Sequence, residues 1–165
     1  LAPQVPILEA LQAMPQEQSA PLWKTLNELE FYYAGKASVM EGANALLQQL
    51  HPSGRRLAIL TRNTMPVVQQ TLQACAIDHF FPLDHILDRD CCLPKPAPDG
   101  ILHLLSLWQA DAEDTVMVGD YLYDLEAGKQ AGVATIHLDT RGDEDWSALT
   151  DLRVGSLGEI TRYLR

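Results

Sequence analysis

Short apolar runs alternate with segments of helical spacing over much of the sequence, and this alternation restricts the possible folds more than any other feature. The apolar runs predict short strands at residues 56–60, 85–87, 115–118 and 134–138. Helical spacing follows at residues 65–76, 99–108, 121–131 and 156–164. Strands that alternate with helices pair in parallel, and the helices cover both faces of the sheet. The sequence therefore predicts an α/β fold with a three-layer, Rossmann-like parallel sheet.

Further helices are predicted before the first strand. Apolar residues recur at helical spacing in 5–14 and 20–36, which indicates two antiparallel helices joined around Pro15. Another predicted helix runs over residues 41–51 and ends before Pro52. The alternating strands and helices thus come after a helical N-terminal segment.

The charge and the apolar runs of the chain exclude two classes of protein. Its 165 residues carry 12 Lys and Arg against 22 Asp and Glu, a net charge of −10, whereas a free-standing nucleic-acid binder needs a basic surface. The apolar runs are far too short to span a bilayer, and the opening residues lack the pattern of a signal peptide. We expect a protein that binds neither nucleic acid nor membrane. Because the chain starts with Leu1, we also expect it to be the remainder of a longer one.

The cysteines Cys75, Cys91 and Cys92 favour reduced thiols in a cytoplasmic protein. They are odd in number, two of them are adjacent, and the sequence has no CxxC or Cys/His spacing typical of zinc sites. Cys91 lies in a polar loop near Arg89, so a reactive thiol is an alternative, although no His/Asn partner pattern accompanies it.

Acidic residues concentrate between Asp111 and Asp151, where eleven of them accompany two basic residues. Such a charge run usually forms a solvated surface. Asp120 and Asp124 differ because they stand four apart after the strand that ends at Gly119, so they can share one face of the helix start. Two carboxylates so placed suit Mg²⁺, which takes oxygen ligands. An Asp120 that merely caps the helix is the alternative.

Two more groups of polar residues are expected at the same sheet edge, because ligands of α/β sheets bind beyond the carboxyl ends of the strands. Thr61, Arg62 and Asn63 offer a hydroxyl and backbone amides at a helix start, which suits an anion, although an ordinary capping loop has the same pattern. Lys95 is flanked by prolines, which hold its ammonium in a fixed direction to neutralise a phosphate or pin a carboxylate. An exposed lysine in a turn is the alternative.

In this order, the motifs resemble those of the haloacid dehalogenase-like hydrolase superfamily. The matching segments are LAILTRN at 57–63, LPKPAPDG at 93–100 and VMVGDYLYDLEAGKQAGV at 116–133. The resemblance covers about residues 40–165 and looks greatest to the phosphoglycolate phosphatase-like branch, whose helical cap precedes the Thr strand. It implies that residues 1–40 are the remnant of a small helical cap and that residues 41–165 form the core domain.

The resemblance also implies a chemistry: hydrolysis of a small-molecule phosphate ester through an aspartyl-phosphate, with Mg²⁺ as cofactor. The implied catalytic residues are Thr61, Lys95 and Asp120. The implied phosphate-binding residues are Thr61, Arg62, Asn63 and Lys95. Mg²⁺ would be bound by Asp120 and by Asp124, the latter as a ligand or by orienting the site.

One motif of the family is missing from the chain. Family members carry Asp-x-Asp-Gly-Thr after their first strand, which supplies the nucleophilic Asp and an acid/base Asp, and no such motif precedes Thr61. Residues 88–90 have the Asp-x-Asp spacing but are followed by two cysteines. We therefore expect that the N-terminal strand has been lost by truncation and that the chain as given is inactive.

The missing strand has a structural consequence. In this family it lies between the strands that end here at Thr61 and Gly119, so its absence leaves two rows of unpaired backbone groups. We expect a gap that a segment outside this numbering or another chain fills, and direct pairing of the two strands would contradict this. The alternative function is a non-catalytic module of degenerate fold that binds a phosphorylated ligand or acts in signalling.

Overall fold

A computed structural model describes residues 6–142 and 145–164 of the chain. Residues 1–5, 143–144 and 165 lie outside this part, so the outer ends of the two predicted domains, 1–40 and 41–165, are not described. Two acidic residues of the 111–151 segment, Asp143 and Glu144, also lie outside the described part. Among the described helices, none is long and apolar enough to cross a membrane.

The strands pair in parallel but form two separate sheets. β1 (Ile59–Leu60) pairs with β2 (Ile86–Leu87). The second sheet contains, in spatial order, β3 (Val116–Gly119), β4 (Ala134–Leu138) and β5 (Leu152–Val154). The predicted α/β fold with parallel strands is therefore confirmed, whereas β5 is a strand that the sequence pattern did not predict.

The helices lie close to the predicted segments. In chain order they are α1 (Ile7–Gln12), α2 (Gln16–Ala34), α3 (Ala43–Leu50), α4 (Met65–Ala74), α5 (Asp99–Trp108), α6 (Leu122–Ala131) and α7 (Leu157–Ile160). Pro66 stands in the first turn of α4, where its fixed φ suits a helix start. Gly132 ends α6 in the left-handed region, at a φ of 77°. Helix starts and stops are thus set by the local signals that the sequence carries.

Helices cover both faces of the second sheet. On one face, Ile136 of β4 packs with Leu46 of α3 and Ile160 of α7. On the other face, the fully buried Thr135 lies so close to α6 that a Cβ on Gly128 would meet it at 2.6 Å. The sheet and its two helical layers give the three-layer, Rossmann-like arrangement that the sequence predicts.

A gap separates the two sheets. β1 and β3 belong to different sheets, and in the described part of the chain each has one edge without a strand partner. A cavity of about 760 Å³ lies between them and is lined largely by residues 54–60 and 114–120. Val116 and Val118 of β3 are 51% and 39% exposed, although parallel strands are normally buried on both faces. The predicted gap is present, and the two strands do not pair with each other.

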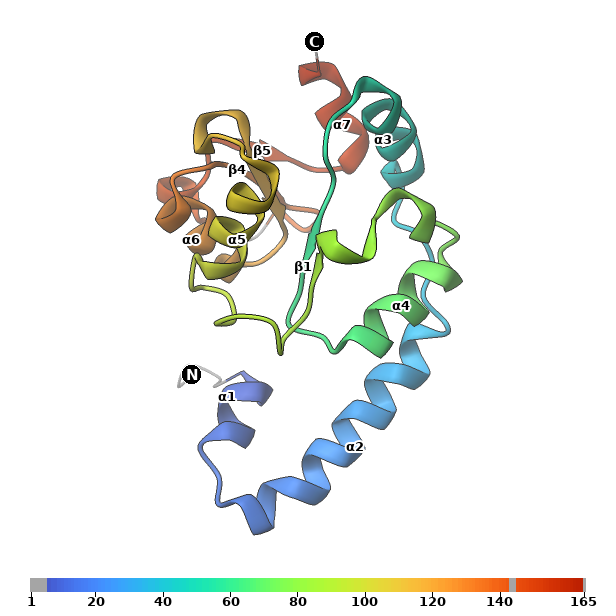
Figure 1. Cartoon of the computed structure of the whole chain (residues 1–165), viewed down its shortest axis with the longest axis vertical. Coiled ribbons are helices and arrows are strands. Elements are labelled where there is room, and N and C mark those ends of the chain that lie inside the picture. Colours follow the sequence, from blue (N-terminus) through green and yellow to red (C-terminus); the bar gives the residue numbers. More distant parts are fainter. Residues whose placement is uncertain (1–5, 143–144, 165) are drawn as a thin grey trace.

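The helices α1 and α2 lie at one end of the molecule, beside the loops that follow β1 and β2 (Figure 1). Arg62, after β1, pairs with Glu9 of α1, and its guanidinium carbon lies 5.1 Å from the centre of the Tyr123 ring. Arg89, after β2, pairs with Glu30 of α2. All four charged side chains are at most 35% exposed. Two partly buried ion pairs therefore attach these helices to the core.

A carboxylate on the acidic segment also joins β4 to the start of β5. Asp151 accepts hydrogen bonds from Nζ of Lys129 at 2.5 Å and from the backbone N–H of Thr135 at 2.8 Å. The bond from Lys129, and next the bond from Thr135, lower the pKa of Asp151 below its usual 3.8. A carboxylate with a lowered folded-state pKa stabilises the protein above the unfolded pKa, and this contribution is lost as the pH falls through the folded value.

The substitution Asp151→Asn is therefore expected to lower the free energy of unfolding at pH 7 and to make acid destabilisation less steep below pH 4. Urea unfolding at pH 7 and at pH 3 measures both effects. Asp84→Asn is the matched control, because Asp84 is an exposed residue away from this junction. An Asp151→Asn protein with the same acid profile as the wild type would contradict the assignment.

Candidate active site

Lys95 connects β1 to α6 at the carboxyl edge of the gap. Its Nζ donates a hydrogen bond to the carbonyl oxygen of Leu60, the last residue of β1, at 2.7 Å. The same Nζ pairs with Oδ1 of Asp124, in the first turn of α6, at 2.5 Å. The side chain of Lys95 is only 12% exposed. The proline-framed ammonium thus pins a carboxylate, and it is not an exposed lysine in a turn.

Asp124 is held through both of its carboxylate oxygens. Oδ1 accepts from Lys95, and Oδ2 accepts the backbone N–H of Tyr121, the N-cap residue of α6, at 3.2 Å. Gly119 makes room for the buried Asp124, since a Cβ at position 119 would lie 2.1 Å from the Cβ of Asp124. Because Tyr121 occupies the N-cap, the alternative in which Asp120 merely caps the helix is wrong.

Asp120 has an exposed side chain at the end of β3 and lines the cavity. Mg²⁺ prefers octahedral coordination by oxygen. Asp124 already uses both oxygens for hydrogen bonds, and the described residues contain no group of three His, Cys, Asp or Glu placed to hold a metal. Asp120 therefore fits as one ligand of a cation, but the described residues do not complete a Mg²⁺ site. The remaining carboxylates would have to come from another segment.

Thr61 is fixed at the carboxyl end of β1. Its N–H extends the strand pairing by donating to the carbonyl oxygen of Leu87 at 2.9 Å. Its Oγ1 accepts the backbone N–H of Asn63 at 3.1 Å, and the carbonyl oxygen of Asn63 accepts the N–H of Arg89 at 3.0 Å. These bonds set the turn that leads into α4. The Thr61 hydroxyl consequently lies at the same sheet edge as Lys95.

Three contributions to this edge have no clear signal in the sequence. Leu60 contributes only a backbone carbonyl oxygen. Glu9 reaches Arg62 across 53 positions of chain, so the Arg62 side chain is used to hold α1 against the core. Asp88, the first acid of the Asp-x-Asp spacing at 88–90, accepts the backbone N–H of Met65 at 3.0 Å and thereby fixes the start of α4.

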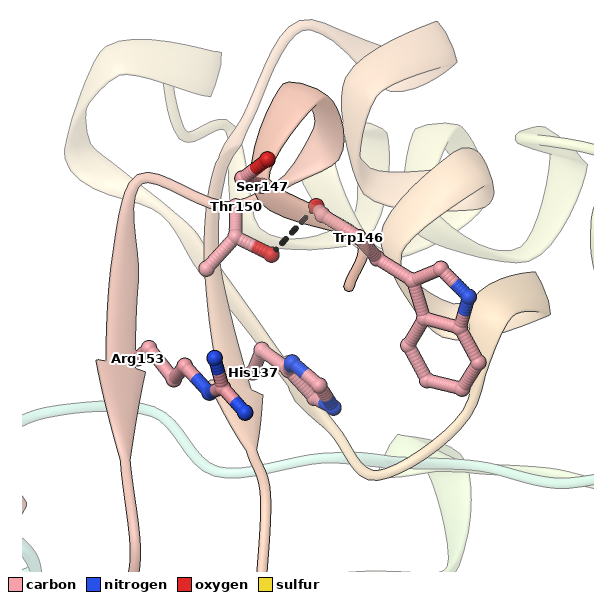
Figure 2. A pocket seen from close by; sticks show the side chains of 5 residues that line it. All are labelled: His137, Trp146, Ser147, Thr150 and Arg153. Atoms are coloured by element: carbon pink, nitrogen blue, oxygen red, sulfur yellow. Dashed lines mark hydrogen bonds between the residues drawn. The ribbon is translucent and has the colours of Figure 1, made fainter. Parts of the chain in front are cut away.

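A second, smaller cavity of about 160 Å³ lies beside β4 and β5. Figure 2 shows that His137 and Arg153, from these neighbouring strands, lie side by side, with Trp146 beside the imidazole. Ser147 and Thr150 complete the lining. This cavity includes none of the predicted site residues, so the candidate active site is the edge of the larger gap.

These features define a Rossmann-like α/β domain with a lysine, a threonine and two carboxylates gathered at the carboxyl edge of its strands. The model of the haloacid dehalogenase-like hydrolase family matches residues 6–138. The chain belongs to this family. The resemblance in the motifs is therefore confirmed at the level of the family.

Individual relatives agree with this assignment. Pyrophosphatase PpaX of Anoxybacillus flavithermus is 39% identical over 89 residues, which are 54% of this chain and 41% of that protein. The chain spans 41%, 44% and 66% of the length of three curated relatives. The structure of CbbY from Rhodobacter sphaeroides in complex with phosphate matches with a TM-score of 0.74 and 25% identity, over 90% of this chain and 67% of that one.

A predicted phosphoglycolate phosphatase from Haemophilus somnus also has a similar structure. It matches with a TM-score of 0.70 and 23% identity, over 76% of this chain and 57% of that one. The chain thus shares its fold with a protein of the branch that the motifs indicated.

Proposed function

We propose that the complete protein is a Mg²⁺-dependent, phosphatase-like hydrolase of small phosphate esters that works through an aspartyl-phosphate in the cytoplasm. The observation that carries the proposal is the position of Lys95, whose ammonium is held at the carboxyl edge of the gap. Thr61 and Asp120 lie at the carboxyl ends of the strands on either side. An ammonium, a hydroxyl and a cation ligand are the groups that stabilise a phosphoryl group during transfer.

The nucleophile would come from a strand inserted between β1 and β3. β1 pairs in parallel with β2 and β3 pairs in parallel with β4, while the other edge of each has no strand partner among the described residues, and both line the cavity of about 760 Å³. An inserted parallel strand ending in Asp-x-Asp would bring its carboxylates to the edge where Lys95 and Asp120 lie. It would also supply the oxygen ligands that Asp120 alone does not provide. The 165-residue chain by itself is accordingly proposed to be inactive.

Each residue at the edge then has a distinct task. Lys95 would neutralise a phosphoryl oxygen and the nucleophilic carboxylate, while Asp124 keeps the ammonium in place. Thr61 would donate its hydroxyl hydrogen to the phosphoryl group, and the amides of Arg62 and Asn63 lie next in the same turn. When bound at Asp120 and the inserted carboxylates, Mg²⁺ would supply further neutralisation of the developing charge.

The chain is divided into a core and a cap in this proposal. We assign residues 41–165 to the core and residues 1–40 to a small cap, of which α1 and α2 are described. The PpaX relatives suggest inorganic pyrophosphate as one substrate to test. A small cap would leave the site open to a range of small phosphate esters.

A non-catalytic module that binds a phosphorylated ligand is the second candidate. One observation favours it: the described residues hold Lys95 and Thr61 in place but do not complete a metal site. Such a module would bind phosphate without releasing it from an ester. Measurement of turnover separates the two functions.

The test uses the full-length protein, including any sequence that precedes Leu1 in its gene. We expect Mg²⁺-dependent release of phosphate from pyrophosphate or p-nitrophenyl phosphate, abolished by EDTA and reduced about 100-fold or more by Asp120→Asn, because one charge-stabilising group is lost. Asp114→Asn is the control, since Asp114 lines the opposite end of the same cavity. No release from a panel of phosphate esters, together with an Asp120→Asn protein that behaves as wild type, would reject the enzyme in favour of the module.

A further inference from the structure

Two neighbouring thiols lie in the loop that carries Lys95. Sγ of Cys91 and Sγ of Cys92 are 3.1 Å apart, in the segment between β2 and α5. Cys91 is exposed and Cys92 is half-buried, and neither forms a disulfide. The pair therefore presents two sulfur atoms to solvent at a fixed, short separation. Nothing in the proposed phosphatase mechanism uses them.

Adjacent residues are poorly placed to form a disulfide with each other. Consecutive Cα atoms are about 3.8 Å apart, which is below the usual range of about 4.4–6.8 Å across a disulfide. Partial desolvation by neighbouring parts of the chain, and next the hydrogen bond with Cys92, raise the pKa of the exposed Cys91 thiol to about 12. Cys91 is thus a protonated, weakly nucleophilic thiol at neutral pH. Both sulfurs stay available to bind one larger atom together.

We propose that Cys91 and Cys92 form a chelating site for a trivalent, thiophilic arsenic compound. Sulfur ligands select soft elements. With an aryl arsine oxide, two S–H bonds and the arsenic–oxygen bond break, two As–S bonds form, and the oxygen leaves as water with the two thiol protons. Arsenic remains trivalent throughout, so the step needs neither an oxidant nor a reductant.

Occupation of this site changes the position of Lys95, which follows Cys92 by three residues. Sγ of Cys92 is packed near the start of α5, where a Cβ on the buried Gly100 would lie 3.2 Å from it. The N–H of Cys91 donates to the carbonyl oxygen of Asp88, which lies at the start of the loop. An atom held between the two sulfurs would add bulk at this packed position, so we expect the loop to shift and the contacts of Lys95 with Leu60 and Asp124 to weaken. This consequence rests on the proposed function, whereas binding itself does not.

The binding test uses purified full-length protein and phenylarsine oxide, with intact-mass spectrometry as the readout. We expect one adduct per chain, with loss of one water, that survives gel filtration and is removed by 2,3-dimercaptopropanol but not by excess 2-mercaptoethanol. Cys91→Ser and Cys92→Ser should each abolish the retained adduct. Cys75→Ser is the control and should keep it, because Cys75 lies apart at the end of α4. A retained adduct in either of the first two variants would overturn the site.

Phosphate release measured in the same samples tests the effect on Lys95. We expect at least a tenfold loss of release in the wild type and in Cys75→Ser, and unchanged release in Cys91→Ser and Cys92→Ser. An adduct without loss of release would overturn the coupling to Lys95. If the protein releases no phosphate at all, the proposed function fails, and the mass measurement still decides whether the dithiol site exists.

Discussion

Replacement of Gly119 by alanine is expected to destabilise the protein by roughly 3 kcal/mol, at the upper part of the range for overpacked interiors. The added Cβ would lie 2.1 Å from Cβ and 2.4 Å from Cγ of Asp124. Asp124 cannot move aside easily, because it is buried and both of its oxygens are hydrogen-bonded at the start of α6. The clash would also separate Asp124 from Lys95. Stability and site geometry are therefore expected to fail together.

Urea unfolding of Gly119→Ala against the wild type measures this loss. Gly158→Ala is the matched control, because an added Cβ there would meet its nearest neighbour, Oγ of Ser156, at an unstrained 3.9 Å. Its free energy of unfolding should change by less than about 1 kcal/mol. A Gly119→Ala protein as stable as this control would contradict the close approach of β3 to α6.

The fold was largely predictable because its signals are local. The α5 and β4 segments were predicted at the residues where they occur, Asp99–Trp108 and Ala134–Leu138. The strand predicted at 56–60 is shorter in the structure, since only Ile59 and Leu60 find a partner in β2. The rest of that segment lines the gap, so it lacks the pairing that defines a strand.

β5 was missed because it has little apolar pattern of its own. It is three residues long, and its central residue, Arg153, is exposed and pairs with Asp139. What makes it a strand is its register with β4, in which Leu152 lies opposite Ile136. A strand defined by its neighbour leaves no periodicity for a sequence argument to find.

The candidate site was predictable in its members but not in its contacts. Chain direction alone places Thr61 and Asp120 at one sheet edge, and the proline-framed Lys95 was expected beside them. It does not show that Lys95 would bond to a backbone carbonyl oxygen of β1 and to a carboxylate at the start of α6. Nor does the spacing of Asp120 and Asp124 show that Asp124 would accept a hydrogen bond on each of its carboxylate oxygens. Such partners depend on tertiary packing between segments far apart in the chain.

Lys95→Met is expected to reduce phosphate release by the full-length protein at least 100-fold, since it removes the charge that would neutralise the phosphoryl group and retains a similar side-chain volume. It also leaves the buried Asp124 without its cation and Leu60 without a donor for its carbonyl oxygen. Removal of one partner from a buried ion pair costs about 3–5 kcal/mol, so the variant should also be less stable.

Two further variants separate charge from packing at Lys95. Lys129→Met makes the same change at the ion pair between Lys129 and Asp151, which lies outside the gap and whose lysine is 33% exposed. The Lys129→Met protein should keep full activity. Lys95→Arg keeps the charge, but a planar guanidinium cannot reproduce the two short contacts of a compact ammonium, so activity should stay low while the protein remains folded. Circular dichroism of each variant shows whether the fold survives. A folded Lys95→Met protein with wild-type turnover would mean that this ammonium only joins Leu60 to Asp124. Other groups at the site would then have to neutralise the phosphate.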